Sequence, residues 1–199
     1  AGPINTPTNT PIPATPTNTA LPPTPTNTPL PVTSTGFLAP SANNAQTSSA
    51  GDKNGYQTGP ANAYLADGVF ATDTSSGTNS NTSCTNSGKD KHFFYNYNFN
   101  IPALTAVKGI EVKLNAKVNS ASSAPKICIQ ISWNGGTTWT TAKNTTTLTT
   151  TNTAYTLGTA IDTWGRTWAL SDFSNANFRI RVIDVASSTA RTFSLDAIS

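Results

Sequence analysis

The sequence predicts an all-β domain, a two-sheet β-sandwich of the jelly-roll type, preceded by an extended polyproline-II arm. Several short segments alternate apolar and polar residues with a period of two, which is typical of half-buried strands. No segment of ten residues or more carries the apolar stripe of a helix. Many short strands at close spacing favour two packed sheets. The arm is predicted by a proline-rich repeat that comes before the domain.

The arm contains one nine-residue unit three times, beginning at Thr6, Thr15 and Thr24. Proline fixes φ and keeps the preceding residue extended, so this spacing predicts polyproline II. That helix has three residues per turn, so the unit repeats in register on every face. One face carries one apolar residue and one asparagine per unit, namely Ile12, Leu21 and Leu30 with Asn9, Asn18 and Asn27.

A periodic apolar face predicts an assembly arm that docks on neighbouring subunits. Ile12, Leu21 and Leu30 would be its anchors, and the three asparagines its hydrogen-bonding residues. The alternative is a flexible or O-glycosylated stalk, which a Thr/Pro-rich composition also fits.

The domain boundaries follow from a shift in composition. No charged residue occurs before Asp52, and eleven of the fourteen prolines lie at or before Pro40. We therefore expect the arm in residues 1–35, a polar connector in 36–61 and the sandwich in 62–199. A domain of that size can bury a core of its own.

The strand predictions come from individual alternating runs. The clearest is 110–118, in which apolar residues alternate with Glu111 and Lys113. A short strand or bent hairpin is expected within 62–72, and the Thr-rich segments have strong β propensity. The other expected strands are 93–99, with Phe93, Tyr95, Tyr97 and Phe99 on one side, 127–133, 178–182 and 193–197; the Thr-rich segments are 137–141 and 145–157.

Residues 132–139 (SWNGGTTW) fit the Asp-box pattern that recurs in sialidase propellers. Asn134 can bond back to the turn, Gly135 and Gly136 can adopt positive φ, and Trp139 can cover the hairpin. Only one copy is present, so the pattern predicts a structural hairpin and no active site.

Cys84 and Cys128 are the only cysteines. Zinc would need more ligands than one histidine can add, so we predict a disulfide in an exported chain. It would attach the long polar loop 73–92 to the outward face of the 127–133 strand. Two free thiols are the alternative.

The sequence predicts neither an enzyme nor a cofactor. His92 and Glu111 are each the only residue of their type, and His92 is expected at a surface or strand edge. No nucleophile with a plausible base is identified. The aspartates lack the dense spacing of a calcium loop, so no metal is expected. Trp164 and Trp168 could present flat rings to a glycan, or could be core and turn anchors.

Charge and composition indicate location and partners. The formal net charge is +3 and the cations are scattered, which gives no support to nucleic-acid binding. No apolar run approaches a membrane span. The absence of methionine and the richness in Thr and Asn indicate a processed, secreted or cell-surface protein.

Residues 62–198 resemble a β-sandwich domain of bacterial surface and fibre-like proteins. The matching stretches are 62–68 (NAYLADG), 99–102 leading to 107–112, 164–168 (WGRTW) and 177–182. The arm is similar to linkers in secreted proteins of filamentous green non-sulfur bacteria. The resemblance implies fold and location and no reaction. Together these features predict a subunit of an extracellular filament or sheath whose partner is itself. A stalked glycan-binding module or adhesin is the alternative.

Overall fold

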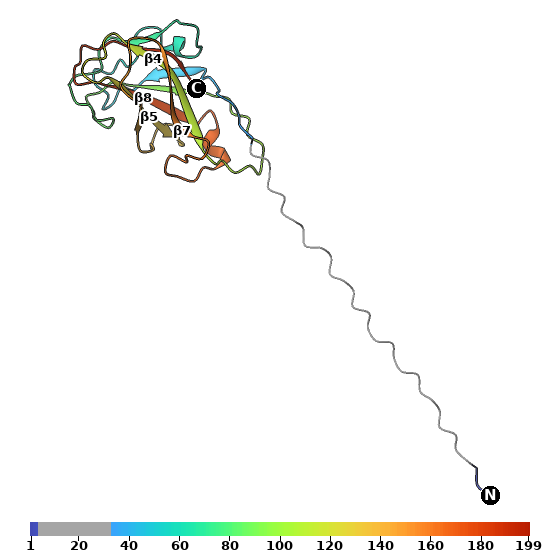
Figure 1. Ribbon diagram of the computed structural model, residues 1–199. Helices are drawn as coiled ribbons and strands as arrows, with labels where there is room; N and C mark the ends of the chain where they lie inside the picture. Colours follow the sequence, from blue (N-terminus) through green and yellow to red (C-terminus); the bar gives the residue numbers. More distant parts are fainter. Residues whose placement is uncertain (4–32) are drawn as a thin grey trace. The chain divides into compact units, whose positions relative to one another are not determined.

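The computed structural model describes residues 1–3 and 33–199, and residues 33–199 form one compact unit. The predicted polyproline-II repeats and their anchors lie outside the described residues. The unit is built of strands with two short 3₁₀ helices, as Figure 1 shows. The elements are β1 (Ala42–Ala45), η1 (Pro60–Ala63), β2 (Ala71–Asp73), β3 (Lys91–Tyr95), β4 (Ile110–Val118), β5 (Lys126–Ser132), β6 (Lys143–Asn144), β7 (Thr153–Thr159), η2 (Leu170–Phe173), β8 (Arg179–Val185) and β9 (Phe193–Ile198).

The strands form two antiparallel sheets packed as a sandwich, which confirms the predicted fold class. One sheet has the order β1-β3-β8-β5-β6 and the other β2-β9-β4-β7. Strands β2 to β9 are distributed between the sheets as in an eight-stranded jelly roll, and β1 is an additional edge strand beside β3. In Figure 1 the neighbours β4 and β7, and β5 and β8, can be followed by their labels.

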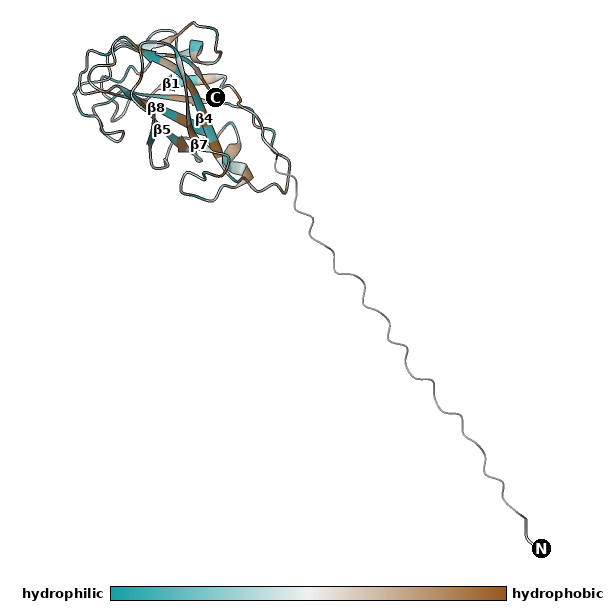
Figure 2. Cartoon of the chain, in the orientation of Figure 1, coloured by the Kyte–Doolittle hydropathy of each residue, from teal (hydrophilic) through white to brown (hydrophobic). Residues whose placement is uncertain are grey.

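The core lies between the two sheets and comes from the alternation read in the sequence. In β4 the buried residues are Val112, Leu114, Ala116 and Val118, whereas the outward Lys113 is only half-buried. Figure 2 shows the resulting alternation of hydrophobic and hydrophilic residues along the strands. The largest fully buried apolar side chains include Phe94, Ile127, Ile129, Ile131, Phe178, Phe193 and Leu195.

The segment expected to be a polar connector, 36–61, contributes to the sandwich. Within it, β1 pairs with β3, and Tyr56 is 2% exposed in the core. Its polar composition concealed a strand because β1 (ANNA) is an edge strand and needs few apolar side chains. The compact unit begins at Thr33.

Two local predictions were wrong in register or type. Strand β3 ends at Tyr95, because Asn96 and Asn98 adopt positive φ of 60° and 53°. Tyr97 is therefore buried in the core and does not share the half-buried side of Phe93 and Tyr95. The expected strand within 62–72 is largely a 3₁₀ turn and loop, and only β2 is extended there. Of the two Thr-rich segments, only 145–157 contributes to a strand, through its last residues in β7, and β6 lies between the two segments.

Candidate functional site

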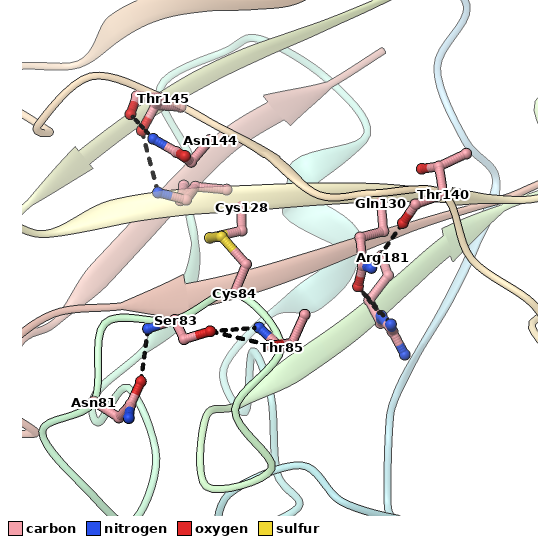
Figure 3. The surroundings of a disulfide bond; sticks show 11 residues. Asn81, Ser83, Cys84, Thr85, Cys128, Gln130, Thr140, Asn144, Thr145 and Arg181 are labelled. Carbon is pink, nitrogen blue, oxygen red and sulfur yellow. Dashed lines mark hydrogen bonds between the residues drawn. A yellow bond between two sulfur atoms is a disulfide. The ribbon is translucent and has the colours of Figure 1, made fainter. Parts of the chain in front are cut away.

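The disulfide predicted from the cysteine pair is present. Cys84 Sγ and Cys128 Sγ are 2.04 Å apart, and their Cα atoms are separated by 5.7 Å. Figure 3 shows Cys84 in its loop reaching Cys128 on β5. Cys128 forms a small apolar cluster with Ile183 and Val185 on the outer face of the first sheet, and Cys84 packs against this cluster. The bond indicates folding in an oxidising environment.

The long polar loop between β2 and β3 is held in place at several further points. Lys89 is 0% exposed, and its ammonium donates to Ser76 Oγ (3.3 Å), Asn79 O (2.6 Å) and Ala186 O (3.1 Å). Burial lowers the pKa of Lys89. Lys91 similarly donates to carbonyl oxygens of two loops. The loop is therefore ordered and fastened to the sheet at several points.

Beside the loop, a row of aromatic and arginine side chains lies on the uncovered half of the same outer face. We call it the aromatic–arginine face; its members are Phe93, Tyr95, Trp139, Arg179 and Arg181, and all five are half-buried. Strand register explains the row, because Phe93 pairs with Arg181 and Tyr95 pairs with Arg179 across β3 and β8. Paired residues of antiparallel strands point to the same side.

The rings and guanidinium groups of this face stack on one another. Trp139 is stacked on Phe93 with ring centroids 5.3 Å apart, and the Arg181 Cζ lies 4.0 Å from the centroid of Trp139. The Arg179 Cζ lies 4.2 Å from the centroid of Tyr95. Contacts of this kind fix flat side chains in one orientation at the surface.

The two arginines differ in their hydrogen bonds. Arg181 donates to Gln130 Oε1 and to Gln46 Oε1 (3.0 Å), and burial lowers its pKa to about 10. Within residues 33–199, the Arg179 guanidinium has its aromatic contact with Tyr95 but no hydrogen-bond acceptor. Arg179 therefore has donors available for a ligand.

The 132–139 hairpin supplies Trp139 to this face and is the structural turn that its motif predicted. Asn134 Oδ1 accepts from Thr138 N (2.8 Å), and Ser132 Oγ accepts from Gly136 N (2.9 Å). Gly135 and Gly136 have φ of 72° and 98°, which is the conformation that glycine favours. Trp139 packs on Phe93 and Arg181, and its indole also lies beside Gly136 of the hairpin, as expected.

The aromatic pair proposed for a glycan is buried. Trp164 and Trp168 are 4% and 7% exposed, and both belong to the core. Their indole N–H groups donate to Ile110 O (2.9 Å) and Thr163 O (2.8 Å). Trp164 has φ of 54°, so the segment is not extended and does not align the two rings as expected. They are core and turn anchors.

His92 is buried rather than at a surface or edge. It is 2% exposed, its Nδ1 accepts from Tyr56 N (3.1 Å), and its Nε2 lies 2.9 Å from Asn43 Oδ1. Burial lowers the pKa of His92 to about 4. A neutral imidazole with both nitrogens bonded links β3 to Asn43 in β1 and to Tyr56 in the segment after it. Glu111 is exposed on β4, away from this bonding.

A second buried polar group lies at one end of the sandwich, and sequence reasoning missed it. Asp73, Asp90 and Asp184 are 0%, 2% and 2% exposed, and we call them the buried aspartate cluster. Tyr56 Oη donates to Asp184 Oδ1 (3.1 Å), whereas Asp73 Oδ2 and Asp90 Oδ2 have no hydrogen-bond partner in the described part of the chain. These aspartates come from β2, β8 and the loop before β3, so no spacing in the sequence unites them.

Burial is the main cause of the pKa shifts in the cluster. It raises the pKa of Asp73 to about 10 and that of Asp184 to about 8, with mutual repulsion adding to the shift of Asp73. Burial and the nearby Asp52 carboxylate raise the pKa of Asp90 to about 7. With these pKa values, Asp73 and Asp184 retain protons at neutral pH, because burial disfavours the charged carboxylate.

The described residues contain no group of three or more His, Cys, Asp or Glu side chains arranged to hold a metal ion. Among the same residues, no helix has the length and apolarity needed to cross a bilayer.

A scan against protein-family models and a search of curated proteins found no match to this chain. The family resemblance expected from the sequence is therefore supported only as far as the two-sheet antiparallel sandwich.

Proposed function

We propose that this protein is a structural subunit of an extracellular filament, assembled by docking of its N-terminal arm on neighbouring subunits. The observation that carries the proposal is the nine-residue unit repeated three times between Thr6 and Val32, with one apolar residue at the same place in each copy. A spacer that only separates two parts has no need of an apolar residue in a fixed register. An arm that docks on identical neighbours needs an apolar residue at the same place in each repeat.

The expected dimensions support this proposal. In polyproline II, twenty-seven residues from Thr6 to Val32 span about 84 Å at about 3.1 Å per residue. A compact unit of 167 residues, Thr33 to Ser199, has a radius of gyration of about 15 Å and a diameter of about 40 Å. An extended arm is thus long enough to contact two successive neighbours.

The compact unit has properties that suit a filament subunit. A covalent bond fastens its longest loop, and ordered hydrogen bonds hold the same loop on the sheet. A sandwich of this kind needs no partner to complete its core, so the arm is free to serve assembly. The arm's neutrality also favours close approach of subunits, because no charge precedes Asp52.

The proposal is tested by changing the arm's apolar face while keeping its stiffness. The variant Ile12→Ser/Leu21→Ser/Leu30→Ser should abolish filaments, since burying each anchor contributes about 1.5–3 kcal/mol. The matched control, Thr10→Ser/Thr19→Ser/Thr28→Ser, changes another face of the same repeats and should assemble normally. Electron microscopy of both purified proteins gives the readout. Filaments of normal diameter from the Ile/Leu variant would refute the anchoring role.

A glycan-binding module on a stalk is the second candidate, favoured by the half-buried rings of Trp139 and Tyr95 beside Arg179. Flat aromatic side chains with nearby donors suit the faces of sugar rings. This function predicts oligosaccharide binding that is unaffected by loss of the arm. Binding measured with and without residues 1–32 separates the two candidates.

A further inference from the structure

We propose that the aromatic–arginine face is the surface on which the arm of a second copy of this chain docks, with a Thr-Pro-Thr-Asn segment lying across it. This inference rests on the proposed filament function and names the docking site that it requires. Four observations about the arm and the face lead to it.

The first concerns the backbone of the arm. Proline has no N–H, and polyproline II makes no internal hydrogen bonds, so its carbonyl groups remain available as acceptors. Each repeat begins with Thr-Pro-Thr-Asn, in which the asparagine side chain adds a further acceptor. The arm therefore presents neutral acceptors and prolyl rings, and its best partner is a flat apolar surface with hydrogen-bond donors.

The second concerns the face. Tyr95 and Trp139 are half-buried, and Arg179 has no hydrogen-bond acceptor within residues 33–199. Proteins that recognise polyproline II do so with aromatic side chains that pack against prolyl rings. The donors of Arg179 lie directly beside Tyr95, so a carbonyl of a docked prolyl segment can accept from them while its ring packs on the phenol.

The third is the rigidity of the face. Phe93 supports Trp139 from β3, and Arg181 is held by Gln46 and Gln130 from β5 and the segment after β1. A pre-ordered face that receives a pre-stiffened arm loses little conformational entropy on binding. We therefore expect the face to bind the arm with measurable affinity even though the contact area is small.

The fourth is size. The face carries residues of β3 and β8 together with Trp139, which lies beside β5; neighbouring strands are about 4.8 Å apart, so the face is about 10 Å wide. At about 3.1 Å per residue, three or four residues of polyproline II cross that width. A Thr-Pro-Thr-Asn segment has this length, and the remaining five residues of each repeat would place the Ile or Leu anchor on the same subunit, next to the face.

The test measures binding of a labelled peptide of residues 6–23 to the compact unit Thr33–Ser199 by fluorescence anisotropy. The double variant Tyr95→Ser/Arg179→Gln should bind at least about tenfold more weakly than the unmodified unit. The control Leu104→Ser/Lys108→Gln also removes one apolar side chain and one positive charge, but from another exposed loop, and should bind normally. Circular dichroism checks that both variants are folded. A peptide of the same composition with its prolines grouped together should bind poorly.

Unchanged peptide binding by the Tyr95/Arg179 variant, or no binding by the unmodified unit, would overturn the docking site. Oligosaccharide binding that needs Tyr95 and Arg179, without peptide binding, would overturn it in favour of a glycan. The same substitutions in the full chain separate this inference from the filament proposal. If full-length filaments need the arm but tolerate Tyr95→Ser/Arg179→Gln, the filament function stands and the docking face is refuted.

Discussion

Trp139 lies almost parallel to Phe93, with an angle of 12° between the ring planes and 5.3 Å between their centroids. The two residues come from a hairpin and a strand that are 46 positions apart in the chain (139 minus 93). The stack joins the 132–139 hairpin to the sheet beneath it. Arg181, over the same indole, adds a third contact from β8.

Removing this indole should destabilise the domain measurably. We expect Trp139→Ala to lower the free energy of unfolding by about 2 kcal/mol, because an aromatic pair contributes about 0.5–1.5 kcal/mol and a cation–π contact about 0.5–1 kcal/mol. Urea unfolding followed by circular dichroism measures the change. Trp139→Phe should recover part of it, and Thr137→Ala, at an exposed position of the same hairpin, should have little effect. Equal stabilities for all three would show that the stack contributes nothing.

The hairpin's internal bonds make a separate prediction. Asn134 accepts from Thr138 N (2.8 Å) and donates to Thr138 Oγ1 (3.0 Å), so Asn134→Ala should cost about 1–2 kcal/mol of stability. The loss should be smaller for Asn134→Asp, which keeps the accepting oxygen. Thermal unfolding of the two variants side by side checks this order. The opposite order would mean that the backbone bond to Asn134 is unimportant.

The disulfide should account for a large share of the stability. Closing a loop of 44 residues corresponds to about 4 kcal/mol in the chain-entropy model. Reductant should therefore lower the urea midpoint of the unmodified protein, and Cys84→Ser/Cys128→Ala should be less stable from the start and unaffected by reductant. Intact mass before and after reduction verifies the bond. Two alkylatable thiols in the purified native protein would contradict the structure.

The buried aspartate cluster predicts that stability falls as pH rises from about 6.5 to about 8. In the unfolded chain, aspartate has a pKa of about 3.9 and is ionised throughout this range. In the fold, burial raises the pKa of Asp184 to about 8 and that of Asp73 to about 10, so the folded state binds more protons. Stability gained from this effect is complete below about pH 4 and is lost as pH rises through the folded pKa values.

The limits of that pH window follow from His92. Burial lowers the pKa of His92 to about 4, so it favours folding as pH rises towards about 6.5 and opposes the aspartate effect there. Above about pH 6.5, His92 is neutral in both the folded and the unfolded state, so the free energy of unfolding changes with pH through the aspartates alone. Each retained proton changes the free energy of unfolding by up to about 1.4 kcal/mol per pH unit. Asp73→Asn should flatten the dependence measured by urea unfolding, and a stability that instead rises between pH 6.5 and 8 would refute this account.

Much of the fold could be predicted from the sequence because alternation and burial coincide where a strand has one solvated face. The strand 110–118 is the clearest case, and its buried residues Val112, Leu114, Ala116 and Val118 are those that the pattern marks. The cysteine pairing was also confirmed, since two cysteines leave only one possible bridge. Strand β1 was missed because an edge strand of Ala and Asn has no apolar pattern.

The candidate surface could not be predicted because it depends on register between strands that are far apart in sequence. Phe93 and Tyr95 were expected on the same side of their strand, and they are, but that side is outward. Only pairing of β3 with β8 brings Arg179 and Arg181 beside them. Trp164 and Trp168 were mispredicted for a local reason. The positive φ of Trp164 breaks the extended backbone that was expected to align the two rings, and both indoles are buried in the core.

The central claim is that the arm assembles subunits into a filament. The most direct measurement compares the full chain with a chain lacking residues 1–32, by negative-stain electron microscopy and sedimentation under the same conditions. The compact unit begins at Thr33 and keeps its core, so the shortened protein should be folded. The account predicts filaments from the full chain and only monomers from the shortened one. Filaments of the same diameter without residues 1–32 would contradict it.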